Sequence, residues 1–162
     1  MRRKDREVTD IAGIEEILRL CKTCHVAMVD GGEPYVVPLS FGYELLPDGG
    51  LELYFHSASI GKKIDILEKN SRVCFETACE GEAAFAEKTP CNSGYYFASV
   101  IGFGEAQFVE DVREKCDALS VLFKHQTGRD VEFTDEQSES VCVFKIVSAE
   151  FTGKRKLRPE GV

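Results

Sequence analysis

The sequence has no apolar run near the roughly 20 residues that a membrane-spanning helix requires. No apolar signal core follows the basic start of the chain, Arg2–Arg6. Low-complexity segments, internal repeats and a domain linker are also missing from its 162 residues. We therefore expect one folded domain over residues 1–162 that stays in the cytoplasm and does not associate with membranes.

Basic residues are fewer than acidic ones. The chain has 20 Lys and Arg against 28 Asp and Glu, which gives a formal net charge of −8. Phosphate backbones and anionic lipids repel a protein with this balance. The composition is 43% hydrophobic and 30% charged, as in a folded globular domain. Nucleic acid is therefore not an expected partner.

The spacing of hydrophobic residues predicts helices alternating with strands. Helical spacing recurs over residues 11–21, 60–67 and 111–127, with Asp10 as the cap of the first helix. The β-branched and aromatic runs predict strands at 24–46 (divided in two by a turn at 30–32), 51–55, 73–77, 95–109 and 141–152. Residues 80–94 have the composition of a loop. Six strands with short connections favour an antiparallel barrel over a parallel α/β sheet.

The junction Phe55–Lys63 is the most informative segment for function. A strand passes there into a helix, whose first turn offers free backbone N–H groups. Lys62 and Lys63 stand in that turn, where cations oppose the helix dipole. A bound phosphate, held with Ser57 and His56, would resolve the conflict. A capped helix with solvated lysines explains the same residues equally well.

The order of several motifs resembles that of the pyridoxamine-phosphate-oxidase-like flavin proteins, in particular their nitroimidazole-resistance branch. The similar segments are Arg2–Arg6, Pro34–Phe41, Leu53–Ala58, Gly61–Lys63, Val73–Glu76 and Ser99–Glu105. The resemblance covers almost the whole chain. It implies a mainly β (α+β) fold, a six-stranded antiparallel Greek-key split barrel with flanking helices, which binds FMN and forms a homodimer with the flavin at its interface.

The resemblance also implies which residues bind the cofactor. The strand along the flavin ring corresponds to Val37, Pro38, Leu39 and Ser40. The phosphate segment corresponds to Phe55, His56, Ser57, Lys62 and Lys63. Residues that reach the partner's flavin correspond to Glu76, Ser99, Val100, Ile101 and Gly102.

The implied activity is an FMN-dependent oxidoreductase that passes electrons from a donor to a small flat acceptor such as a nitroaromatic. Pro38 and Ser40 stand where the oxidase branch carries arginines, which argues against oxidation of pyridoxamine phosphate. No acid–base pair stands out, so no catalytic residue is assigned. A flavin- or haem-binding protein without turnover, with His56 as the haem ligand, is the alternative, because the nicotinamide-binding pattern G-x-G-x-x-G is absent.

Cys21–His25 matches the haem-attachment pattern C-x-x-C-H, and it also holds three metal-ligand types. We interpret these residues as structural, because haem attachment normally needs export and zinc lacks a fourth ligand nearby. The other cysteines mostly lie in apolar runs, typical of reduced core thiols. His125 is expected at the surface or as a helix cap, and Gly153–Lys156 as a solvated basic tail. Pro38 predicts an edge strand.

Overall fold

The computed structural model describes residues 3–84, 91 and 93–156. The helices are η1 (Lys4–Arg6), α1 (Ile11–Leu20), α2 (Lys62–Lys69), α3 (Val112–Thr127) and α4 (Asp135–Glu139). The strands are β1 (Glu7–Val8), β2 (Thr23–Asp30), β3 (Glu33–Ser40), β4 (Gly42–Leu45), β5 (Leu51–Ser57), β6 (Arg72–Ala84), β7 (Gly94–Phe108) and β8 (Cys142–Lys156). None of the helices described is both long and apolar enough to span a bilayer.

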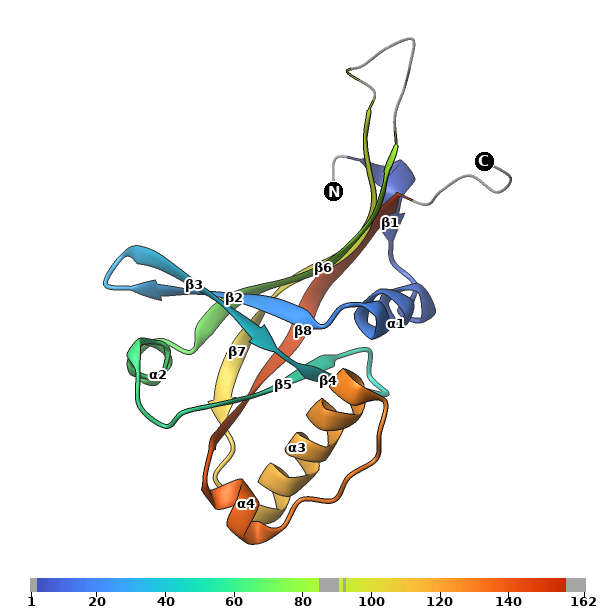
Figure 1. Ribbon diagram of the computed structural model, residues 1–162. Helices are drawn as coiled ribbons and strands as arrows, with labels where there is room; N and C mark the ends of the chain where they lie inside the picture. The colour runs from blue at the N-terminus through green and yellow to red at the C-terminus, as the bar shows by residue number, and fades with distance from the viewer. Residues whose placement is uncertain (1–2, 85–90, 92, 157–162) are drawn as a thin grey trace.

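The strands form one antiparallel sheet in the order β3-β2-β6-β7-β8-β5-β4, and β1 pairs with β8. The sheet coils without closing, and long β6, β7 and β8 run through the molecule from end to end (Figure 1). Helix α1 lies on one side, and α3 with α4 lies beneath β4 and β5 (Figure 1). The predicted mainly antiparallel split-barrel class is confirmed. Pro38 lies on an edge strand, as expected, since β3 ends the order.

Local sequence signals, such as helix caps, predicted most of the helices and strands correctly. The carboxylate of Asp10 accepts a 2.8 Å hydrogen bond from the backbone N–H of Gly13 and begins α1. Asp111 begins α3 in the same way, and Gly128, at a positive φ of 74°, ends it. The short helix α4 was not expected, although Thr134 and Gln137 form a capping box there.

The predicted strand over 33–46 is two strands. It divides at Phe41, because Gly42 passes so close to α3 that a Cβ would lie 2.5 Å from the Cα of Leu122. β3 and β4 then sit at opposite ends of the sheet order. With the two-residue β1, the described chain has eight strands instead of six.

The C-terminal basic segment is not a solvated tail, so this prediction was wrong. β8 continues to Lys156 and pairs with β7, with Ser99 opposite Lys154. Arg155 turns to α1, where Nη1 lies 3.0 Å from a carboxylate oxygen of Glu16. Strand pairing extends this far because β7 itself begins at Gly94. The predicted loop 80–94 is shorter at both ends, and its residues 85–90 and 92 lie outside the described chain.

The core has two parts. The larger lies inside the coiled sheet and receives Ile14, Ile17 and Leu18 from α1. Phe55 and Phe144 stack within it at a ring distance of 5.0 Å. The smaller lies between α3 and the outside of β5 and β8. Because α3 covers β5 from outside, residues that alternate along β5 face two different environments.

Cys21 and Cys24 are buried in the larger core, as predicted. Burial raises the pKa of each thiol to about 12, so both stay protonated and behave as small apolar groups. Cys91 by contrast is exposed. In residues 3–84, 91 and 93–156, no three His, Cys, Asp or Glu side chains are placed to hold a metal ion.

His125 was expected at the surface or as a helix cap, but it is half-buried and bonds a residue outside its own helix. Nε2 lies 2.8 Å from the backbone oxygen of Cys21, and the ring contacts Phe41 and Tyr43 at 4.8 and 5.0 Å between centroids. Gln126, whose amide donates to the oxygen of Phe41, acts with His125, so that the end of α3 is held to the segment before β2 and to the junction of β3 and β4. Burial lowers the pKa of this imidazole.

His125 should therefore make stability depend on pH. Because the folded pKa lies below the unfolded value of about 6.5, the unfolded chain binds the proton more readily. The contribution of His125 is present above that pH and is lost as pH falls through the folded pKa. Urea unfolding at pH 8 and pH 5 should show a smaller loss of stability for His125→Gln than for wild type. An equal loss in both proteins would contradict this.

Candidate functional site

The register of the sheet places residues from five strands in one row. His25 in β2 is opposite Pro38 in β3 and opposite Glu76 in β6. Glu76 is opposite Ile101 in β7, and Ile101 is opposite Thr152 in β8. Directly opposed residues of antiparallel strands point to the same face. Their side chains are exposed or half-buried, so the row lies on the outside of the sheet.

Neighbouring rows extend this surface, which we call the outer sheet face. On one side the row contains Val36, Ala27, Cys74 and Phe103. On the other side Ser40 pairs with Thr23, and Ser99 pairs with Ala78. Val36, Ile101 and Phe103 are 57, 47 and 50% exposed. Large apolar side chains gathered on a surface indicate a binding or association site.

The outer sheet face brings together five of the predicted cofactor residues from three separate segments: Pro38, Ser40, Glu76, Ser99 and Ile101. The alternate residues Val37, Leu39, Val100 and Gly102 point to the inside of the sheet. Gly102 lies against the core, since a Cβ there would be 2.5 Å from the ring of Phe75. Only the backbone of these four residues can reach a ligand outside.

The predicted phosphate residues lie at the start of α2. Gly61, at φ 143°, precedes the helix and provides no side-chain cap, so the first-turn N–H groups suit an anion. Lys62 Nζ lies 3.4 Å from a carboxylate oxygen of Asp30 and 4.8 Å from the centre of the Tyr35 ring. The helix start therefore stands beside the β2–β3 hairpin.

The remaining phosphate candidates lie on β5, before the helix. The hydroxyl of Ser57 donates to the oxygen of Ala58 at 2.8 Å, a bond that rotation of the hydroxyl releases. Phe55 is completely buried in the core, whereas its neighbour His56 is exposed. Phe55 can therefore only support the site from inside.

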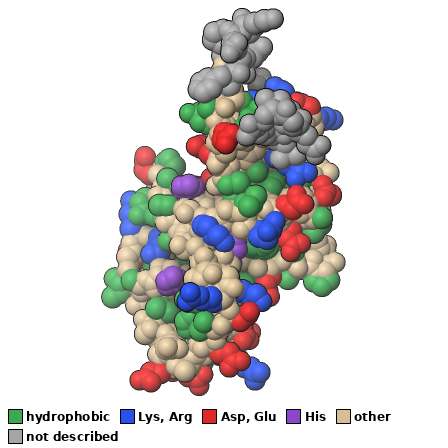
Figure 2. Space-filling model, turned by 45° about the vertical axis from the view of Figure 1, so that its right-hand side comes forward, with side chains coloured by type: hydrophobic (Ala, Val, Ile, Leu, Met, Phe, Trp, Pro, Cys, Tyr) green, Lys and Arg blue, Asp and Glu red, His purple; other side chains and the backbone are tan. Residues whose placement is uncertain are grey.

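His56 opens onto a cavity of about 360 Å³ between β5, α3 and α4. The walls are mostly apolar and include Leu119, Phe123, Phe133 and Val141. Phe123 and Phe133 meet edge to face at 6.0 Å. Acidic side chains gather at this end of the molecule, where α4 lies (Figures 1 and 2). The cavity suits a small apolar group rather than an anion.

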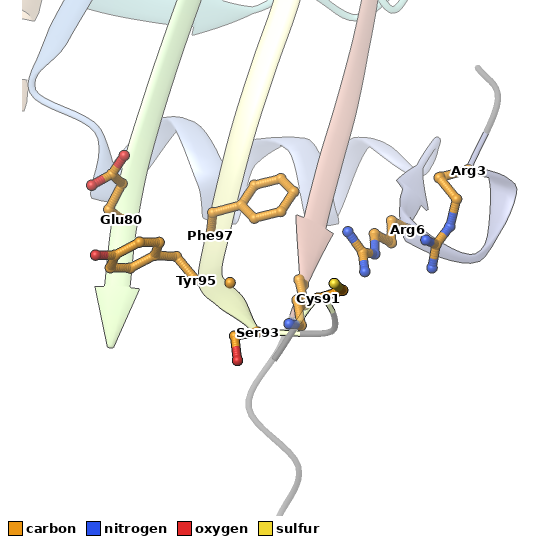
Figure 3. A pocket seen from close by; sticks show the side chains of 9 residues that line it. Arg3, Arg6, Glu80, Cys91, Ser93, Tyr95 and Phe97 are labelled. Carbon is orange, nitrogen blue, oxygen red and sulfur yellow. The ribbon is translucent and has the colours of Figure 1, made fainter. Parts of the chain in front are cut away.

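A second cavity, of about 750 Å³, lies at the opposite end of the sheet. Figure 3 shows Tyr95 and Phe97 of β7 on one side and Arg3 and Arg6 on the other. The guanidinium of Arg3 donates hydrogen bonds of 2.7 and 2.6 Å to the carboxylate of Asp5. Glu80 also lines the cavity, and Asp5 lies 3.9 Å from Arg6, so the basic side chains do not indicate an anion site.

One residue of the outer sheet face was missed from the sequence as a site candidate. His25 had been grouped with Cys21 and Cys24, yet only the cysteines are buried. Its Nδ1 lies 3.1 Å from Oε2 of Glu76, 51 residues further along the chain. The alternation of β2, in which Cys24 and Val26 point inward, is the signal that separates His25 from them.

A model of the pyridoxamine 5'-phosphate oxidase family matches residues 10–155. The chain belongs to this family. Another member of known structure is a protein of Bacteroides thetaiotaomicron with the provisional name 5-nitroimidazole antibiotic resistance protein. It is 32% identical, with a TM-score of 0.77 over 91% of this chain and 85% of that one. None of the curated proteins is a match.

Two further solved structures share the fold of this chain. The flavocytochrome Anf3 of Azotobacter vinelandii is 23% identical, with a TM-score of 0.79 over 98% of this chain and 73% of that one. An FAD- and haem-binding protein of Mycobacterium smegmatis is 16% identical, with a TM-score of 0.76 over 97% and 77%. At this identity the likeness establishes the shared fold.

Proposed function

We propose that the protein is an FMN-binding oxidoreductase that reduces a small flat acceptor such as a nitroimidazole or another nitroaromatic. The observation that carries this proposal is the outer sheet face. There, Pro38 and Ser40, expected at the flavin ring, lie in the same two rows as Glu76, Ser99 and Ile101, which are expected to reach a partner's flavin. The name of the Bacteroides relative supports a nitroimidazole-type acceptor.

The residues present suit FMN. Lys62, Lys63 and the uncapped start of α2 would hold its phosphate, with the hydroxyl of Ser57 as a further donor. The free edge of β3, around Pro38, would offer backbone groups to the polar side of the ring. FMN would supply the redox chemistry, which amino-acid side chains lack. The protein would orient the ring and exclude water from it.

We also propose that the protein works as a cytoplasmic homodimer. A second copy on the outer sheet face would cover Val36, Ile101 and Phe103 and complete the ring site. Cytoplasmic thiols stay reduced, which suits the seven cysteines. The electron donor would be a small molecule that approaches the bound flavin.

A second candidate is a flavin- or haem-binding protein without turnover. It is favoured by the exposed imidazole of His56, which offers an axial ligand beside the apolar walls formed by Phe123 and Phe133. On this alternative, haem would enter from the side of α3, opposite the outer sheet face.

An absorption spectrum of the purified protein, combined with light scattering, tests both candidates. We expect flavin bands that dithionite bleaches, and a particle of twice the 18.0 kDa chain mass. Adding FMN should raise the melting temperature, because a ligand of the folded state stabilises it. A Soret band would favour the haem candidate. An 18.0 kDa particle that still holds FMN would contradict the shared site.

A further inference from the structure

His25 and Glu76 form a polar pair at the centre of the outer sheet face. They come from neighbouring strands in direct register, and Nδ1 of His25 lies 3.1 Å from Oε2 of Glu76. Their side chains are 51 and 36% exposed. The pair is therefore held in place yet accessible to a ligand on this face.

The strands next to the pair contribute uncharged side chains, whereas β8, at the side of the face, adds Glu150 and Lys154. In the central row and the two rows beside it, β3, β2, β6 and β7 contribute apolar or small uncharged side chains, among them Val36, Ala27, Ile101 and Phe103. A second copy that covers this face would remove water from the pair. Polar groups that lose their hydration seldom add stability over apolar residues, so the position of this pair indicates a role in chemistry and not in stability.

We propose that His25 is the proton donor of the reduction and that Glu76 is the residue that positions it. This inference rests on the proposed flavin function. When Nδ1–H donates to Glu76, the second ring nitrogen, Nε2, remains for the acceptor, and no group within the described chain bonds it. The row places Pro38 beside His25, so the imidazole lies next to the strand expected at the flavin ring.

The chemical step balances. Reduced FMN would supply a hydride to the acceptor, and the His25 imidazolium would supply one proton from Nε2. FMN would thereby lose the two electrons that the acceptor gains. With a nitro compound the products are the nitroso compound and water, and the neutral imidazole recovers its proton from solvent. Proton transfer by a positioned side chain contributes about 100-fold or more to such rates.

The test compares two acceptors. Wild type and His25→Gln, both loaded with FMN and reduced by one equivalent of dithionite, are mixed in stopped flow with nitrofurazone, which needs protons, or with ferricyanide, which takes an electron alone. We expect His25→Gln to react about 100-fold more slowly with nitrofurazone and at an almost unchanged rate with ferricyanide. Equal losses with both acceptors, or no loss with nitrofurazone, would overturn the proposal.

Glu76→Gln tests the positioning role, with Glu150→Gln, a carboxylate of β8 on the same face, as its matched control. Nitrogen NMR of the neutral imidazole, which is left after Nε2 has given up its proton, should show the remaining proton on Nδ1 in wild type and in Glu150→Gln, and a shift towards Nε2 in Glu76→Gln. If Glu76→Gln has the same tautomer as wild type, Glu76 does not position His25. Failure of the proposed function itself is distinguishable, because wild type would then bind no FMN or leave nitrofurazone unreduced.

Discussion

The double variant Lys62→Ala, Lys63→Ala should bind FMN at least about 100-fold more weakly than wild type, because each charge-assisted hydrogen bond to phosphate is worth about 1.5–3 kcal/mol. Ser57→Ala, which removes a neutral donor, should cost about tenfold or less. Fluorescence titration of the flavin gives the dissociation constants. The fold should persist, since the ion pair of Lys62 with Asp30 is exposed and contributes at most about 1 kcal/mol.

Lys69→Ala is the matched control for this variant. Lys69 is the last residue of the same helix, so its removal changes the net charge of α2 but not of the helix start. It should leave the dissociation constant of FMN unchanged. If the double variant and wild type bind FMN equally well, the start of α2 is not the phosphate site.

Ile101→Asp should convert the proposed dimer to a monomer and release most of the flavin. Ile101 points out of β7 at the centre of the outer sheet face. A carboxylate there would lose its hydration when a second copy covers the face. The chain should stay folded, because the side chain of Ile101 lies outside the core. Light scattering and the flavin-to-protein absorbance ratio provide the measurement.

Val131→Asp is the control for this prediction. Val131 is another exposed apolar residue, located between α3 and α4 and away from the sheet. The same substitution there should change neither the mass of the particle nor its flavin content. A dimer that persists in Ile101→Asp with full flavin content would show that the outer sheet face is not the interface.

Several elements could be predicted because their signals are local. Asp10 caps the helix that follows it, and Gly128 ends α3, through contacts within a few residues. The strand-to-helix junction at Ser57–Lys62 is readable for the same reason. The order of the motifs along the chain was sufficient to indicate the flavin family, and the match over residues 10–155 confirms it.

Other features depend on which strands meet. The break at Phe41 sends β3 and β4 to opposite ends of the sheet because Gly42 packs against α3, and nothing near Gly42 in the sequence indicates that contact. The basic residues at 154–156 belong to a strand only because β7 is long enough to pair with them. His25 looked like part of a cysteine cluster until the register set it beside Glu76.

The sequence by itself determined the antiparallel fold class, most helices and strands, the edge position of Pro38 and the family. The tertiary structure alone decided which predicted site residues share a surface, which of them point into the core, and that an imidazole and a carboxylate stand at the centre of that surface. Helix caps and hydrophobic periods act over a few residues, whereas side-chain neighbours across a sheet depend on register between strands tens of residues apart, which packing of the whole domain sets.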